Sequence, residues 1–216
     1  MAERILIFGA TGGTGQQLVY QALERGYHVT AFVRDPTRLD IEDDNLEIVI
    51  GNFLDAAAVD RAVAAGFGAV LCPMGIYQRE YKTTLSDGTK NILAAMKKHG
   101  IDRLLVVSSM GVGDSKGQGS WLVRAYARVM LKYVIWDKNI QEADIRASGL
   151  DWTIVRPPRL FHTPEINPNV IVWSGPQPNR KFAWSTTRAT LAKVLLDALA
   201  GGQYISQAVN MSDPKE

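Results

Sequence analysis

The feature that most constrains this 216-residue chain is a glycine-rich turn near its N-terminus. An apolar run over residues 4–8 stops there, and a helical pattern follows at once. One glycine permits a tight turn, a second lets backbone approach a pyrophosphate, and a third lets the helix pack closely on a strand. The N–H groups and dipole of the first helical turn favour phosphate, although glycine also suits an ordinary turn. We predict a dinucleotide-binding turn formed by Gly9, Thr11, Gly12, Gly13, Thr14 and Gly15.

Beyond this turn, short apolar runs alternate with helical patterns along the chain. The predicted strands cover residues 5–8, 29–33, 46–50, 69–72, 104–108 and 152–155. The predicted helices cover residues 14–25, 56–64, 86–99 and 187–199, with one long helix within 120–148. Such alternation is typical of an α/β fold, a Rossmann-type doubly wound parallel sheet with helices on both faces.

The length of the chain suits one hydrophobic core, so we predict a single NAD(P)-binding domain over residues 1–216. Within it, residues 1–158 form the cofactor-binding core. Residues 159–186 form a substrate loop in a small C-terminal lobe, and residues 187–216 form a C-terminal helix and tail.

The composition argues against several other classes of protein. A single cysteine, Cys72, allows no internal disulfide, so a reducing, cytoplasmic compartment is expected. The formal charge of +2 and the absence of a long apolar run argue against nucleic acid and membrane partners, and no secretory leader is expected. The three histidines stand far apart, so no metal site is predicted. We expect a monomer or homodimer.

Ligands of such sheets bind beyond the carboxyl ends of the strands. The second predicted strand runs into Arg34 and Asp35, with Arg38 shortly after. Arginine at this place accommodates the 2′-phosphate of NADP, whereas an acidic residue would bind the ribose of NAD. NADP is therefore the favoured cofactor and NAD the less favoured one. Two alternatives remain open, since Asp35 can pair with the arginine and the group can be a solvated charge cluster.

The third and fourth strands end in further candidate binding residues. Asn52 can hydrogen-bond the adenine edge and Phe53 can flank the ring, while Asp55 suits a cap of the next helix. The corner after the fourth strand suits a nicotinamide ribose, although its methionine can equally fill the core. It consists of Pro73, Met74 and Gly75.

Together these residues resemble the short-chain dehydrogenase/reductase superfamily, in its atypical branch around biliverdin reductase B (flavin reductase) and the NmrA-like proteins. The resemblance covers nearly the whole chain and rests on residues 9–15, 33–39, 51–55, 87–109 and 148–158. It implies that Ser109, with Ser108 beside it, lines a nicotinamide pocket. It also implies that Pro157 and Pro158 lay their backbone along the nicotinamide.

The chain departs from that superfamily where the usual proton donor would stand. None of its seven tyrosines has a lysine four residues later. Lys138 resembles the superfamily's lysine, but Val134 occupies the tyrosine position and Tyr133 is one residue off, about 100° around a helix. Arg159 stands where biliverdin reductase B has a histidine, so specific biliverdin reduction is in doubt.

This departure guides the predicted activity. Reducing a ketone requires a positioned acid, worth roughly 10²–10⁴ in rate, whereas flavins and quinones delocalise the added charge. We predict an NADPH-dependent reductase of planar acceptors with Ser109, Arg159 and Lys138 as catalytic residues. For Ser109 a strand-end hydroxyl bonded to backbone is the open alternative, and for Arg159 a surface charge. A non-catalytic, NmrA-like NADP(H)-binding regulator is the alternative function, and an isomerase ranks last.

The segment over residues 161–184 lacks periodicity and is expected to form a wall or lid over the acceptor. Its two tryptophans, Trp173 and Trp184, suit a planar ring, although they can simply pack the loop down. Four aromatics of the predicted long helix can also line the pocket, but packing in the core or an interface is favoured for most of them. They are Trp121, Tyr126, Tyr133 and Trp136.

Overall fold

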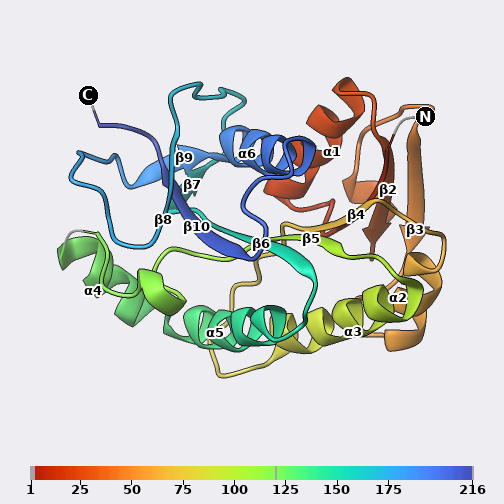
Figure 1. Ribbon diagram of the computed structural model, residues 1–216, viewed down its shortest axis with the longest axis horizontal. Helices are drawn as coiled ribbons and strands as arrows, with labels where there is room; N and C mark the ends of the chain where they lie inside the picture. Colours follow the sequence, from red (N-terminus) through yellow and green to blue (C-terminus); the bar gives the residue numbers. More distant parts are fainter. Residues whose placement is uncertain (1–2, 120, 216) are drawn as a thin grey trace.

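The computed structural model describes residues 3–119 and 121–215, and this part of the chain is organised around a sheet of eight strands (Figure 1). The order is β3-β2-β1-β4-β5-β6-β10-β8. All neighbours pair in parallel except β10 and β8, which are antiparallel. The strands are β1 (Arg4–Phe8), β2 (His28–Val33), β3 (Leu46–Ile50), β4 (Ala69–Cys72), β5 (Arg103–Val107), β6 (Asp151–Arg156), β8 (Ile171–Ser174) and β10 (Gln207–Ser212).

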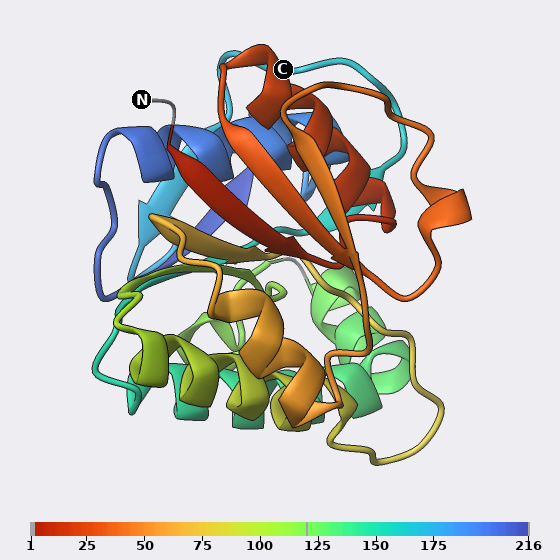
Figure 2. The same ribbon diagram turned by 90° about the vertical axis from the view of Figure 1, so that its right-hand side faces the viewer.

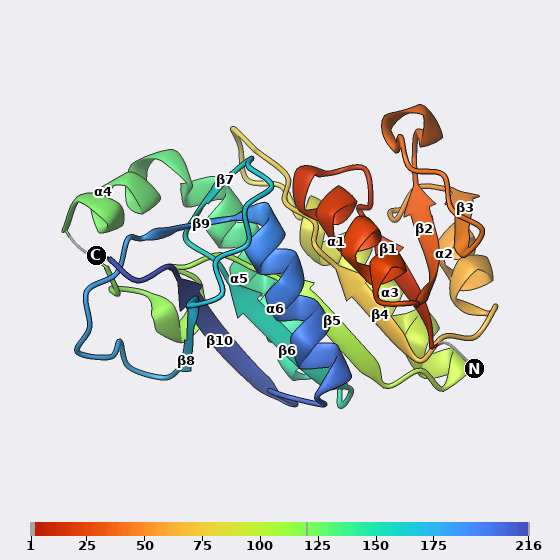
Figure 3. The same ribbon diagram turned by 90° about the horizontal axis from the view of Figure 1, so that it is seen from above.

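Helices cover both faces of this sheet, as Figures 2 and 3 show. On one face lie α1 (Gly13–Glu24) and α6 (Arg188–Ala200), and on the other α2 (Ala56–Val63), α3 (Thr84–His99) and α5 (Lys132–Arg146). The helix α4 (Trp121–Met130) lies beyond them, at the end of the molecule where β8 and β10 lie (Figure 3). The predicted doubly wound α/β fold is therefore confirmed.

Strand β1 shows why the sheet needs helices on both sides. Its side chains alternate, so Ile5 and Ile7 join the hydrophobic cluster under α1 and α6, whereas Leu6 and Phe8 join the cluster under α2 and α3. All four are fully buried. A strand that is apolar on both faces therefore stays out of water only in the centre of a three-layer fold.

Local signals account for several of the helix ends. Asp55 caps α2, accepting hydrogen bonds from the N–H groups of Ala57 and Ala58 at 3.0 and 3.1 Å, as predicted. Gly100 ends α3 with φ +67°, a backbone conformation that suits glycine. These signals set the length of each helix, and hence where the following loop meets the sheet.

Three expectations for the second half of the chain need correction. The helix expected within residues 120–148 is two helices, because the chain breaks at Leu131. The segment over 161–184 contains β8, and the C-terminal tail contains β10, which extends the sheet beyond β6. Two further short strands, β7 (Arg159–Phe161) and β9 (Ser185–Thr187), pair in parallel apart from the main sheet. Runs of three to six residues carry too little periodicity to be seen in sequence.

Among the described residues, no helix is long and apolar enough to cross a membrane. The cytoplasmic location, the oligomeric state and the division of the chain after residues 158 and 186 stay predictions.

Candidate functional site

The glycine-rich turn joins β1 to α1 in a geometry that other residues cannot adopt. Gly9 ends the strand with φ +79°, and the Gly12 N–H donates to its carbonyl at 3.1 Å. A Cβ on Gly15 would overlap the carbonyl oxygen of Gly9 and lie 2.7 Å from the Cα of Ala10. The helix therefore packs on the turn only because Gly15 has no side chain. The first-turn N–H groups of α1, which have no acceptor within the helix, lie at the strand end.

A cleft of about 340 Å³ opens next to this turn, at the carboxyl ends of β1 to β4. It brings together ten of the sixteen residues predicted to bind cofactor. The ten are Gly9, Thr11, Gly12, Arg34, Arg38, Asn52, Phe53, Pro73, Met74 and Gly75. Of the other six, Gly13, Thr14 and Gly15 form the adjoining turn of α1, while Ser108, Pro157 and Pro158 lie at the ends of β5 and β6.

Two exposed arginines stand at the rim of this cleft, after β2. Asp35 does not neutralise Arg34, because its carboxylate accepts hydrogen bonds from N–H and Oγ1 of Thr37 at 3.1 and 2.6 Å. Gln16 of α1 donates to the carbonyl of Arg38 at 2.9 Å and so ties this turn to the glycine-rich one. Within the described residues neither arginine forms an ion pair, so both guanidinium groups are available to an anion.

The opposite wall of the cleft is fixed by α3. The Asn52 side chain accepts a hydrogen bond from the N–H of Leu54 at 3.1 Å, which holds the turn and leaves its amide N–H groups to a ligand. Phe53 is buried so close to Gly88 that a Cβ on this glycine would overlap its ring. Asn91 donates to the Phe53 carbonyl at 3.0 Å. This wall is therefore preformed.

The ends of β5 and β6 bring four further predicted residues together. Ser108 N–H donates to Val155 at 2.8 Å, and Met110 N–H donates to Pro157 at 3.0 Å, so both serines lie beside both prolines. The Ser109 hydroxyl donates to the carbonyl of Met110 at 3.2 Å, which is the backbone-bonded alternative for this residue. Ser108 Oγ is buried and, among the described residues, has no hydrogen-bond partner.

Lys138 supports this region through buried hydrogen bonds. Its side chain is 3% exposed, and its ammonium donates to the carbonyls of Val107 at 2.9 Å and Met74 at 3.4 Å. It thereby links the ends of β4 and β5. Burial lowers the pKa of Lys138 to about 8, and burial also raises the pKa of the nearby Cys72 thiol to about 11. The geometry gives Lys138 a supporting place in the core, and its catalytic role stays a prediction.

Arg159 takes a different position from the one that its predicted role suggests. It is exposed, and its guanidinium lies 4.8 Å from the centre of the Phe161 ring, two residues along β7. Arg159 lines neither the cleft next to the glycine-rich turn nor a second, larger cavity of the protein. Its catalytic role also stays a prediction.

A second, larger cavity of about 930 Å³ lies between α4, α5 and the segment over residues 110–118. Met110 and Gly111 line it, and they directly follow Ser109. The cavity therefore begins where the row of strand-end residues stops. Its walls carry the aromatic side chains Tyr81, Trp121 and Trp136.

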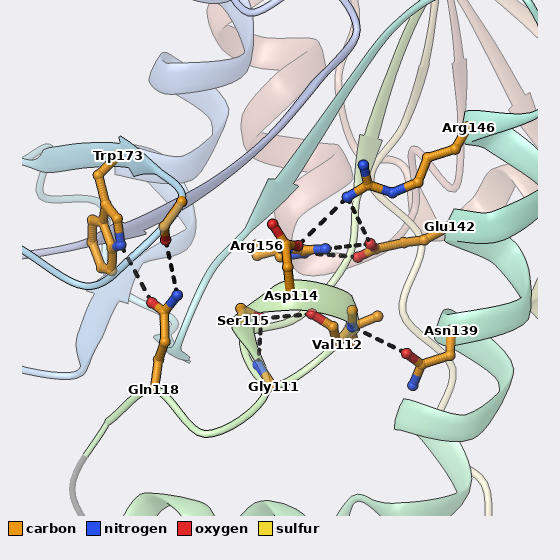
Figure 4. A network of polar contacts seen from close by, with 12 residues as sticks. Gly111, Val112, Asp114, Ser115, Gln118, Asn139, Glu142, Arg146, Arg156 and Trp173 are labelled. Carbon is orange, nitrogen blue, oxygen red and sulfur yellow. Dashed lines mark hydrogen bonds and ion pairs between the residues drawn. The ribbon is translucent and has the colours of Figure 1, made fainter.

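An ion network centred on a buried arginine holds the 110–118 segment in place (Figure 4). Arg156, fully buried at the end of β6, donates to both carboxylate oxygens of Glu142 and to Asp114. Arg146 lies 3.6 Å from Asp114 and 3.7 Å from Glu142. Burial raises the pKa of Asp114, but the hydrogen bond and charge of Arg156 outweigh it and lower the pKa overall. Asn139 adds a bond to the Gly113 N–H at 3.0 Å.

Residues 9–201, most of the chain, match the NAD(P)H-binding family. This chain belongs to the NAD(P)H-binding family. One curated relative is an uncharacterized chloroplastic protein of Arabidopsis thaliana, 30% identical over 207 residues, which are 91% of this chain and 72% of the relative. The chain spans about half the length of two other curated relatives, 52% and 50%.

Solved structures share the fold of this family member. A short-chain dehydrogenase/reductase of Veillonella parvula in complex with NADP aligns with a TM-score of 0.84 and 20% identity, covering 99% of this chain and 96% of that one. An anaerobillin reductase of Escherichia coli O157:H7 aligns with a TM-score of 0.81 and 22% identity, covering 99% and 98%. The predicted resemblance is confirmed for the fold and for NAD(P)H binding.

Sequence reasoning missed two side chains at the glycine-rich turn. A Cβ on Gly13 would lie 2.7 Å from Cδ and 2.8 Å from Nε of Arg188, and 3.1 Å from Nδ1 of His162. Arg188 begins α6 and also donates to the carbonyl of Leu160 at 3.3 Å. No local pattern marks these residues, because they come from distant segments. Arg188 reaches the turn through the packing of α6 on α1, and His162 directly follows β7.

The aromatic residues are distributed differently from expectation. Trp173 is 7% exposed, packs on Phe182 with ring centres 4.6 Å apart, and donates to Gln118 at 3.3 Å. It therefore packs its loop down, which was the alternative, while Trp121 and Trp136 line the larger cavity. Lining the pocket was one of the two possibilities for these residues, and packing was expected for most of the four aromatics. The side chain of Tyr126 lies outside the described residues.

Proposed function

We propose that this chain is an NADPH-dependent reductase that passes a hydride to a planar acceptor such as a flavin or a quinone. The observation that carries the proposal is the pairing of two cavities. The smaller one has the glycine-rich turn and two arginines without ion pairs among the described residues, and the larger one has aromatic walls and begins directly after Ser109. Hydride transfer needs a cofactor site and an acceptor site that adjoin, and in this proposal Ser108 and Ser109, which line neither cavity, lie between the two.

The residues of the smaller cleft fit a dinucleotide phosphate. The turn fits a diphosphate because Gly9 and Gly15 let backbone come close, and because Arg188 brings a cation to the same place. Arg34 and Arg38 fit the 2′-phosphate that distinguishes NADPH from NADH. Ser108 Oγ, buried and without a partner in the described part of the chain, fits a polar group at the strand ends.

When bound, NADPH supplies a hydride, and with one proton taken from water the acceptor gains two electrons and NADP⁺ remains. The chain's own part is to bind and to orient. Pro157 and Pro158 form one side of the nicotinamide site, and Ser109 orients the ring or donates a hydrogen bond to the acceptor. Lys138 holds the strand ends that carry this site. Arg159 is exposed on β7 and lines neither cavity, so its position does not support the predicted role of stabilising negative charge on the acceptor.

The absence of a tyrosine–lysine pair in the sequence supports a planar acceptor. A carbonyl needs an acid for the alkoxide that forms, whereas a conjugated ring spreads the added charge and takes its proton from water. One protein that shares this fold is named an anaerobillin reductase, which is compatible with reduction in this fold. The same absence favours the alternative function, a non-catalytic NADP(H)-binding regulator.

The first test is the consumption of NADPH by purified protein with flavins, quinones and small carbonyls, with NADH in parallel. We expect turnover with the planar acceptors and little with simple carbonyls. Tight, saturable binding of NADPH without turnover on any acceptor would favour the regulator.

Arg34→Ala tests the assignment of the cofactor. Loss of a charge-assisted contact with the 2′-phosphate should raise KM for NADPH by about tenfold to a hundredfold. KM for NADH, which has no such phosphate, should not change and serves as the internal control. An equal rise for both cofactors would contradict the assignment.

A further inference from the structure

The larger cavity carries a concentration of positive charge that the proposed function alone does not require. Four of its lining residues are cationic, and none of those that the structure describes is acidic. Arg124 and Arg128 stand four residues apart, on one face of α4. Lys116 comes from the preceding segment and Lys132 from the start of α5. The four cations thus come from three segments of the chain.

These four cations have neutral neighbours. Arg124 donates to the carbonyl of Gly117 at 3.3 Å, and the Lys132 ammonium lies 4.6 Å from the centre of the Tyr133 ring. Within the described part of the chain, none of the four forms an ion pair with a carboxylate.

Acidic side chains on or beside the segments that form the cavity have partners of their own. Asp114 and Glu142 are bound by Arg156 and Arg146. Asp137 is fully buried in α5, where it accepts hydrogen bonds from the N–H groups of Leu85 and Ser86 at the start of α3. Glu80, which precedes Tyr81, forms an ion pair with Lys82 at 2.7 Å. Each of these four carboxylates thus pairs with a group other than the four cations.

The aromatic side chains of the cavity remain accessible. Tyr81 is 61% exposed, Trp121 68% and Trp136 39%. Tyr81 and Trp136 meet edge to face, with ring centres 5.3 Å apart. Large rings exposed beside cations are an unfavourable surface to leave in water, and they suit a ligand that is both flat and anionic.

We propose that the cavity selects planar acceptors that carry negative charge. The ring system lies among Tyr81, Trp121 and Trp136, and its phosphate or carboxylate groups meet Lys116, Arg124, Arg128 and Lys132. This inference rests on the proposed reductase function and deepens it, since it distinguishes charged from neutral acceptors with the same ring.

Flavin mononucleotide (FMN) and riboflavin form the matched pair of probes, because they share one ring system and differ by a phosphate. With saturating NADPH, KM should be about tenfold lower for FMN than for riboflavin at low salt, where several exposed cations act together. The difference should shrink as salt rises, because the Debye length falls from about 10 Å at 0.1 M to about 3 Å at 1 M.

Arg128→Gln should raise KM for FMN about threefold and leave KM for riboflavin unchanged. Lys97→Gln is the matched control, because it removes the same charge from an exposed position on α3 outside the cavity. KM for NADPH should not change in either variant. Equal KM values for the two flavins, or a preference for FMN that Arg128→Gln and Lys97→Gln change equally, would overturn the inference.

Equilibrium binding separates this inference from the proposed function. Quenching of flavin fluorescence, measured with NADP⁺ present, reports binding of FMN and riboflavin without turnover. Tighter binding of FMN that Arg128→Gln weakens supports a charge-selective cavity even if no flavin is reduced, and in that case only the reductase function fails. Turnover of both flavins with equal affinity sinks the inference and leaves the reductase function standing.

Discussion

The two cavities of this chain are built in different ways. The smaller cleft, which we propose as the cofactor cleft, is formed by turns that directly follow β1 to β4, and four glycines line it. The larger one, which we propose as the acceptor cavity, is formed by residues of α4, α5 and the 110–118 segment, which lie beyond the sheet. Backbone geometry shapes the first, and contacts between distant segments shape the second.

This difference separates what the fold requires from what it leaves open. A dinucleotide phosphate needs close backbone and the start of a helix, and both come with the β1–α1 unit itself. The acceptor cavity depends on Arg156, Glu142 and Asp114, which fix the 110–118 segment from β6 and α5. Side chains that point into the acceptor cavity can change without disturbing the sheet. The fold therefore restricts the residues of the cofactor cleft more than those of the acceptor cavity.

Gly15→Ala should have the largest effect, because it breaks the cleft at its narrowest backbone contact. The new Cβ would overlap the Gly9 carbonyl oxygen, so α1 must move away from the turn. Overpacking of this kind costs about 1–3 kcal/mol, and Kd for NADPH should rise about tenfold to a hundredfold. Titration of NADPH fluorescence measures Kd, and urea unfolding measures stability.

Gly26→Ala is the control for this comparison. Gly26 has positive φ, +80°, which strains any side chain, but nothing lies within 4 Å of its added Cβ. It should lose about 1 kcal/mol of stability and keep its affinity for NADPH. Similar losses of affinity in both variants would mean that the cleft depends on general stability and not on the contact at Gly15.

Sequence alone predicts which residues gather at the glycine-rich turn and the cleft beside it, for the same reason. Gly9, Gly12 and Gly15 indicate a backbone geometry directly, and the arginines after β2 are placed by the end of the strand. Arg188 escapes such a reading, because α6 follows α1 by more than 160 residues and only their packing brings it to Gly13. The residues that a turn positions locally can be predicted from sequence, whereas the residues that packing between distant helices brings to the turn cannot.

Arg188→Gln should weaken cofactor binding less than Gly15→Ala does. Its guanidinium lies against the turn that fits the diphosphate, a group that NADPH and NADH share. Loss of this half-buried cation should raise Kd for both cofactors about threefold to tenfold. This outcome contrasts with Arg34→Ala, which should affect NADPH alone. A loss confined to NADPH, or none at all, would remove Arg188 from the diphosphate site.

The acceptor half was predicted less well, and particular residues show why. Trp173 looks like a lid residue in sequence, but β8 carries it into a buried cluster with Met110 and Phe182. For Trp121 and Trp136 the sequence leaves packing and lining the pocket both open, on one long predicted helix. The break at Leu131 divides that helix into α4 and α5, and both tryptophans line the larger cavity. These outcomes depend on a short strand and a helix break, for which the sequence has no periodic signal.

Lys138 joins the two halves, and its titration should give the smallest effect. In the folded chain its pKa is about 8, below the usual 10.5, because burial penalises the ammonium. Above about pH 8 the native protein has released a proton that the unfolded chain retains, so the free energy of unfolding rises with pH. The rise should reach about 1 kcal/mol by pH 9, measured by urea unfolding.

Lys138→Met should abolish this rise, because it removes the group that titrates. The pH range of the unfolding measurement must end near pH 9, because above that pH the titration of Cys72 lowers the free energy of unfolding. Its thiol has a folded pKa of about 11 against 9.0, so the native protein keeps a proton that the unfolded chain loses, and stability falls. A rise of equal size in the variant would assign the effect to other groups. No rise in the variant would assign the effect to the buried ammonium that links the ends of β4 and β5.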